Sequence, residues 1–188
     1  MKTFDVVIEG STPILFDNPA GMSEPTPGKG APKLTAQEQA ERGCYWMSDK
    51  SSLMFPGDNV HAALKVVAPG YKYSGKKTLG SYVAGSVVVV PEEIPFGTKS
   101  YAIDTRRIVN KSTKGASLKS RPKLKSWKLP FQILIEDDFP VKPDPGPIVK
   151  EMLEEAGRRV GIGSYRPTCK GRFGKFIVTK FSEIKGRS

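Results

Sequence analysis

Nine lysines and arginines gather without an acidic neighbour between residues 106 and 128. The residues between them, such as Asn110, Ser112 and Thr113, are polar hydrogen-bonding groups suited to phosphate oxygens. A run of this kind can also be a solvated loop that keeps a protein soluble. Because the run contains no acid and leads into Trp127, we expect it to contact a polyanion. The predicted contacts are Arg106, Arg107, Lys111, Lys114, Lys119, Arg121, Lys123 and Lys125.

A second segment, residues 161–175, mixes glycines, cations and aromatic residues, and we call it the glycine loop. Glycine lets a partner approach the backbone closely, and Tyr165 and Phe173 offer faces on which bases can stack. Lys175 is followed by Phe176 and not by Ser or Thr, so the loop is not an NTPase phosphate loop. A helix precedes it and a strand follows it, so it is not a dinucleotide-binding motif either. The alternative is a glycine-rich turn packed against the helix, with Phe173 in the core. The predicted contacts are Gly161, Gly163, Tyr165, Arg166, Lys170, Gly171, Arg172, Phe173 and Gly174.

His61 is the single histidine and, with Lys65, the candidate for catalysis. The two are spaced i, i+4 on one face of a predicted helix, and a general acid or base contributes about 10²–10⁴-fold to a rate. The alternative is a surface histidine or one that contacts phosphate. No second histidine accompanies it, so we expect no catalytic residue. Adjacent acids such as Glu92 and Glu93 point in different directions, so we expect no metal site.

The composition limits the classes of partner and compartment. The net charge is +11, and residues 61–130 hold 14 lysines and arginines against three acids. Such a surplus indicates a nucleic acid or an anionic membrane surface as partner. No apolar stretch approaches the roughly 20 residues of a membrane span. Two cysteines exclude a disulfide framework, so we expect a cytoplasmic protein with no cofactor and no membrane partner.

Hydrophobic spacing predicts the elements that must position these residues. Alternation at Phe4, Val6 and Ile8 indicates a half-buried strand, and Thr35 with Glu38 forms a capping-box motif before a short helix. The other predicted strands cover 82–90, 101–109, 127–136 and 173–181, and the longer helices cover 57–68 and 148–160.

Without its insertions, the chain runs strand, helix, strand, strand, helix, strand. This order predicts an α+β, ferredoxin-like (RRM-like) fold with two helices on one face of a four-stranded antiparallel sheet. We expect a single domain over 1–188, with insertions at about 11–55 and 110–126, the second forming a projecting basic hairpin. The open sheet face or this hairpin is then free to meet a ligand.

Several of these motifs resemble those of the CRISPR-associated RAMP superfamily. The glycine loop lies where that superfamily has a glycine-rich loop between its last helix and last strand. Gly10-Ser11-Thr12-Pro13-Ile14-Leu15 and the segment from Pro56 to Leu64 are similar to its backbone subunits and to small phage or prophage relatives, and residues 110–126 occupy the place of a "thumb" hairpin. The resemblance implies binding of single-stranded nucleic acid, usually RNA, along a helical row of identical subunits.

The sequence therefore predicts a non-catalytic protein that binds single-stranded RNA, or single-stranded DNA, with little sequence preference and assembles as a homo-oligomer. One alternative is a metal-independent endoribonuclease that uses His61, with Lys65 beside it. Another is a structural or assembly protein that contacts nucleic acid.

Overall fold

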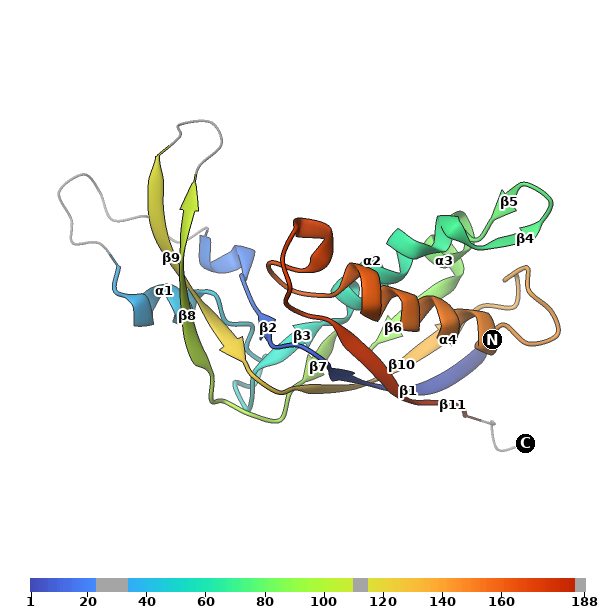
Figure 1. Cartoon of the computed structure of the whole chain (residues 1–188). Helices are drawn as coiled ribbons and strands as arrows, with labels where there is room; N and C mark the ends of the chain where they lie inside the picture. Colours follow the sequence, from blue (N-terminus) through green and yellow to red (C-terminus); the bar gives the residue numbers. More distant parts are fainter. Residues whose placement is uncertain (23–33, 110–114, 185–188) are drawn as a thin grey trace.

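A four-stranded antiparallel sheet forms the centre of the computed structural model, which describes residues 1–22, 34–109 and 115–184 (Figure 1). Its strands are β1 (Lys2–Gly10), β6 (Val87–Val90), β10 (Lys128–Ile135) and β11 (Phe176–Glu183). Their order across the sheet is β11-β1-β10-β6. With both longer helices on one face, this is the ferredoxin-like arrangement, and the predicted α+β fold class is confirmed.

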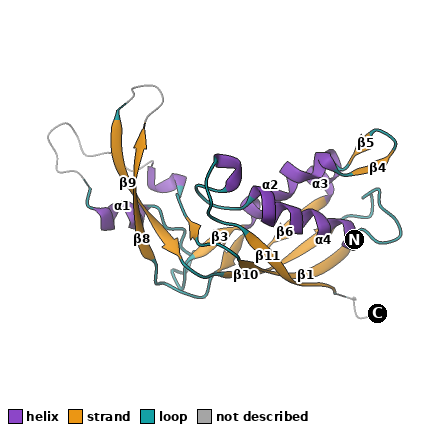
Figure 2. Cartoon of the chain, viewed as in Figure 1, coloured by secondary structure: helices purple, strands orange, loops and turns teal. Residues whose placement is uncertain are grey.

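The core lies between the sheet and two helices, α2 (Gly57–Val67) and α4 (Gly146–Glu155), as Figure 2 shows. Strand β1 contributes the predicted alternate residues Phe4, Val6 and Ile8, all buried. Helix α2 contributes a stripe of Val60, Ala63, Leu64 and Val67, and α4 contributes Val149, Met152 and Leu153. Burial of these apolar faces contributes about 25 cal/mol per Å², so the core fixes the orientation of everything attached to it.

Two predicted strands begin later than expected. The segment 82–90 starts as helix α3 (Gly80–Ser86), because Leu79 and Val83 are both fully buried at the i, i+4 spacing of a helix. The strand predicted from Phe173 begins at Phe176, because Gly174 has a φ of +69° and breaks the extended backbone. Phe173 therefore belongs to the glycine loop.

A long hairpin projects from the sheet, formed by β8 (Ala102–Val109) and β9 (Ala116–Leu124). The segment predicted at 101–109 pairs with β9 and not with the central sheet, so the projecting hairpin starts before residue 110. Lys111 and Lys114 lie outside the described residues. Strand β2 (Ile14–Leu15) pairs with the base of β9 and ties the hairpin to the segment that follows β1.

Trp127 anchors the hairpin where β9 leads into β10. Its indole is buried, its Nε1 donates to the carbonyl of Thr12 at 2.8 Å, and its ring meets those of Phe96 and Phe176 edge-on. Gly10 lies against the indole so closely that a Cβ there would come within 2.2 Å of Nε1. The tryptophan predicted to border a basic ligand surface is thus a structural residue.

Shorter elements complete the chain. Helix α1 (Ala36–Arg42) has the predicted capping box, with Glu38 N donating to Thr35 Oγ1 at 3.2 Å, and it packs on β9. The remaining strands are β3 (Met54–Pro56), β4 (Lys72–Ser74), β5 (Lys77–Thr78) and β7 (Glu93–Pro95), where β3 pairs with β7 and β4 with β5. The β4–β5 hairpin lies at the far end of the molecule from the β8–β9 hairpin (Figure 1).

Candidate nucleic-acid interface

One face of the β8–β9 hairpin, which we call its inner face, carries four cations. The strand register places Asp104 opposite Arg121 and Arg106 opposite Lys119. Asp104 is 8% exposed and accepts hydrogen bonds from Arg106 Nη2 at 3.1 Å and Lys123 Nζ at 3.0 Å. These bonds, that of Arg106 first, hold the pKa of the Asp104 carboxyl below its usual value.

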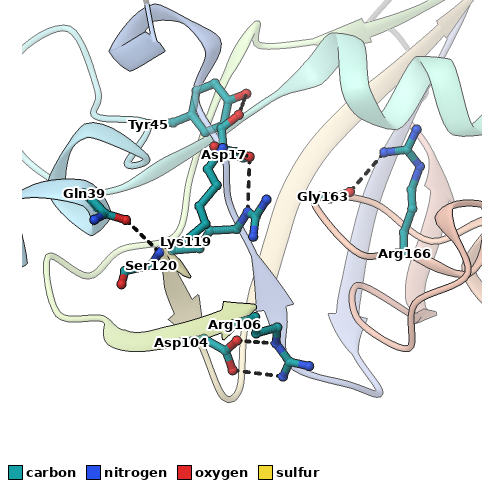
Figure 3. Close-up of polar contacts among 10 residues, drawn as sticks. Asp17, Gln39, Tyr45, Asp104, Arg106, Lys119, Ser120, Gly163 and Arg166 are labelled. Atoms are coloured by element: carbon teal, nitrogen blue, oxygen red, sulfur yellow. Dashed lines mark hydrogen bonds and ion pairs between the residues drawn. The ribbon is translucent and has the colours of Figure 1, made fainter. Parts of the chain in front are cut away.

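Asp17 binds the other two cations of the inner face (Figure 3). Its Oδ2 accepts from Lys119 Nζ at 2.6 Å and from Arg121 Nε at 3.1 Å. Asp17 reaches the hairpin because β2, two residues earlier, pairs with Leu124 and Lys123 of β9. All four predicted phosphate contacts on this face therefore have carboxylate partners within the chain.

The inner face also meets the glycine loop through arginine–aromatic contacts. The guanidinium of Arg106 lies 4.7 Å from the ring centre of Phe173, and that of Arg121 lies 5.0 Å from the ring centre of Tyr165. Contacts of this kind stabilise by about 0.5–2 kcal/mol, depending on solvation. Two segments that are more than 40 residues apart in the sequence thus form one continuous surface.

Phe173 does not offer the open ring that the sequence analysis predicts for base stacking. It is 5% exposed and lies beneath Arg106, with Arg172 at 5.9 Å from its ring centre. The alternative interpretation, with Phe173 packed inside, describes its position. Tyr165, half-buried at a φ of +51°, contacts Arg121 and Arg106.

The glycines of the loop serve its own packing. A Cβ on Gly174 would lie 1.7 Å from the carbonyl oxygen of Ile162, and one on Gly163 would lie 2.6 Å from that of Leu15. Both residues also have positive φ. Gly161 is buried, and Gly171 lies against the Tyr165 backbone. These glycines let the chain fold on itself, as the alternative of a packed glycine-rich turn predicts.

The predicted cations differ in exposure. Arg166 is half-buried and donates from Nη1 to the Gly163 carbonyl and from Nε to Thr168 Oγ1, both at 3.0 Å. Arg107 alternates with Arg106 along β8, so it lies on the opposite, outer face of the hairpin. Among the predicted cations that the structure describes, the exposed ones are Arg107, Lys125, Lys170 and Arg172.

The ion pairs do not cancel the positive charge of this surface. The inner face has four cations against Asp17 and Asp104, and the glycine loop adds Arg166, Lys170, Arg172 and Lys175 with no acid between residues 161 and 175. An excess of cations therefore remains where the hairpin and the loop meet.

The open face of the central sheet lacks the stacking residues of an RNA-recognition sheet. The phenylalanines Phe4, Phe131 and Phe176 are buried on the helical side, and the ring of Phe181 contacts that of Phe4 at 4.9 Å. The opposite side presents residues such as Asp5, Gln132 and Ile177, and none of the described strand residues facing it is aromatic. Base stacking on the sheet, the basis of RNA-recognition-motif binding, has no platform here.

His61 and Lys65 lie on α2. His61 Nε2 is 2.8 Å from the carbonyl oxygen of Val83, so an Nε2–H group ties α2 to α3, whereas Lys65 is exposed.

Burial raises the pKa of the Cys44 thiol to about 12, which disfavours the thiolate. Within the described ranges, no three His, Cys, Asp or Glu side chains are grouped to hold a metal ion.

Asp17 and Asp104 were not among the residues predicted from the sequence. Asp104 had a signal, because residues i and i+2 share one face of a strand and Arg106 follows it at that spacing. Asp17 had none, because it lies 102 residues from Lys119 and 104 from Arg121.

No protein-family model matches this sequence, and a search of curated proteins gives no match. Among solved structures, 49 chains match. One belongs to the cryo-EM structure of the Type III-B Cmr-beta bound to cognate target RNA, with a TM-score of 0.62 and 13% sequence identity. The alignment covers 98% of this chain but 61% of that chain, so this protein spans about three fifths of its length. The similarity shows the fold alone, and the relations to the RAMP superfamily and to phage proteins stay predictions. None of the described helices has the length and apolarity needed to cross a membrane.

Proposed function

We propose that this protein binds single-stranded nucleic acid, RNA in preference to DNA, along the surface where the β8–β9 hairpin meets the glycine loop. The observation that carries the proposal is the pair of arginine–aromatic contacts, Arg106 with Phe173 and Arg121 with Tyr165, which join two basic segments. The solved structure with the similar fold contains bound target RNA.

Phosphates are the part of the strand that this surface suits best. Lys170 and Arg172 are exposed on the loop, and Lys125 is exposed at the base of the hairpin. Backbone phosphate contacts carry no sequence information, so binding has little sequence preference. Each neutralised phosphate releases counterions, which makes the affinity depend steeply on salt.

A fluorescence-anisotropy titration with a labelled 20-nucleotide RNA tests the proposal. With about five phosphate contacts, the affinity should fall roughly 100-fold between 50 and 200 mM salt. The variant Lys170→Gln/Arg172→Gln should bind about tenfold more weakly at 50 mM salt, with a shallower salt dependence.

The matched control is Lys76→Gln/Lys77→Gln, which removes the same charge from the exposed β4–β5 hairpin at the far end of the molecule. It should bind within about twofold of the unmodified protein, because charges beyond a Debye length, about 14 Å at 50 mM salt, are largely screened. An equal loss in both variants would contradict the assignment of this surface.

We further propose that copies of the protein assemble in a row along the strand. Light scattering with RNAs of 10, 20 and 40 nucleotides should give complexes whose mass rises with strand length. A constant mass would contradict the row and leave the binding surface untouched.

A further inference from the structure

A cavity of about 200 Å³ opens beside the surface assigned above to the phosphates. Its apolar side is formed by Phe16 and Phe55, which are both 1% exposed. Its polar side is formed by Asp17, Asn59 and Arg166, with Tyr45, Gly163 and Ser164 completing the lining.

The cavity stands between the two groups of cations. Asp17 is held by Lys119 and Arg121 of the hairpin, and Arg166 belongs to the glycine loop. A second cavity of about 70 Å³ also includes Asn59 and Arg166, so the hollow continues along the exposed side of α2. A strand whose phosphates meet the hairpin and the loop passes the mouth of this hollow.

The lining suits a neutral ring with donors and acceptors better than a phosphate. Both ion pairs of Asp17 end at Oδ2, so Oδ1 takes part in neither, and a carboxylate oxygen repels a phosphate. A carboxylate accepts from base N–H groups, and an arginine donates to base acceptors. Asn59 has both a donor and an acceptor in its amide.

The size of the cavity limits the ligand to a single ring system. Sites for drug-sized ligands are about 300–1,000 Å³, and this cavity is smaller. Unstacked bases of single-stranded RNA are recognised by hydrogen bonds to their edges against aromatic or arginine surfaces. Arg166 provides such a surface here, whereas Phe16 and Phe55 are buried and form the closed apolar floor of the cavity.

We infer that the cavity between Phe16, Phe55, Asn59 and Arg166 receives one unstacked nucleobase of the bound strand. The inference rests on the proposed function and adds a single base-reading position to an otherwise sequence-independent contact. Asn59 and Asp17 bind the edge of the base, and the phosphates on either side stay with Lys170 and Arg172 of the loop and with Lys125 at the base of the hairpin.

The test uses ten-residue strands of 1-deoxyribose phosphate, which lack bases, compared with the same strand carrying one guanine. A single base in an otherwise bare strand can slide until it reaches the cavity. At 50 mM salt, anisotropy should show about tenfold tighter binding of the strand with the base, the gain expected of one stacked base.

Asn59→Leu replaces the amide with an apolar side chain of similar size, so it removes the donor and the acceptor from the cavity wall. This variant should bind the bare strand as the unmodified protein does and should lose the tenfold gain, whereas the control Ser81→Leu, at an exposed position of α3, should keep it. Equal binding of both strands by the unmodified protein would overturn the inference while leaving the proposed function intact. Retention of the gain by folded Asn59→Leu would also overturn it. Failure of both strands and of the 20-nucleotide RNA to bind would instead contradict the proposed function.

Discussion

The inner face of the hairpin and the glycine loop each carry four cations but use them differently. On the inner face, Asp17 and Asp104 pair with all four, and Arg121 is 8% exposed. In the loop, Lys170 and Arg172 are exposed, and none of the ion pairs formed between described residues involves a cation of the loop. The paired cations assemble the surface, and the exposed ones are those that can meet a phosphate.

Basic residues therefore have two roles here, assembly of the surface and binding of phosphate, and a count of basic residues does not distinguish them. A cation held by a carboxylate must lose that partner before it binds a phosphate, and a buried one must also become solvated. Variants of the inner face should therefore act first on stability, and variants of the loop should act first on binding.

Asp17→Asn should have the largest effect on stability. The substitution leaves Arg121 buried without its carboxylate, and Nη1 of this arginine is already buried without a hydrogen-bond partner. Removal of one partner of a buried ion pair costs about 3–5 kcal/mol, and the partial exposure of Asp17 reduces this to about 2–3 kcal/mol. Urea denaturation at pH 7 measures the change.

Asp137→Asn is the matched control, because Asp137 pairs with the N-terminal amine on the open surface. It should leave the urea midpoint unchanged. An Asp17→Asn variant as stable as the unmodified protein would show that the hairpin does not depend on this ion pair.

The second prediction concerns pH and Asp104. Arg106 and Lys123 hold the pKa of its carboxyl below the usual 3.8. The folded state then binds this proton less readily than the unfolded state, so the stability from Asp104 is present above about pH 4 and is lost as the pH falls through the lowered pKa. Asp104→Asn should cost about 1–2 kcal/mol at pH 7, and this difference should shrink between pH 4 and pH 2.

Urea denaturation of both proteins at pH 7, 4, 3 and 2.5 measures that difference. Glu136→Gln, at an exposed carboxyl just after β10, serves as the control and should follow the unmodified protein. A difference between Asp104→Asn and the unmodified protein that stays constant down to pH 2.5 would contradict the assignment of Asp104 as the titrating group.

The central fold was predictable because its signals are local. Alternation at Phe4, Val6 and Ile8 and the apolar stripes of α2 and α4 each lie within one element. The ion pairs of Asp17 depend on the pairing of β2 with β9, and no periodicity within one element reports such a contact. Phe173 was misread because burial of an aromatic ring next to a glycine depends on the tertiary packing of Arg106 over it.

The cavity was not predictable for the same reason. Its lining comes from four separate segments, at Phe16, Tyr45, Asn59 and Ser164, and each of these residues taken alone is ordinary for a core or a surface. The glycine loop was predicted from the sequence, and this loop places Arg166 at the edge of the cavity.

The smallest expected effect belongs to Arg107, which distinguishes the two faces of the hairpin. Arg107 is exposed like Lys170 and Arg172 but lies on the outer face, opposite Leu118. Arg107→Gln should weaken binding of the 20-nucleotide RNA by about twofold or less at 50 mM salt, because it lowers the local potential without removing a phosphate contact. The slope of affinity against salt should stay unchanged, since no counterion release is lost. A tenfold loss with a shallower slope, as expected for the loop variant, would place the strand on the outer face of the hairpin.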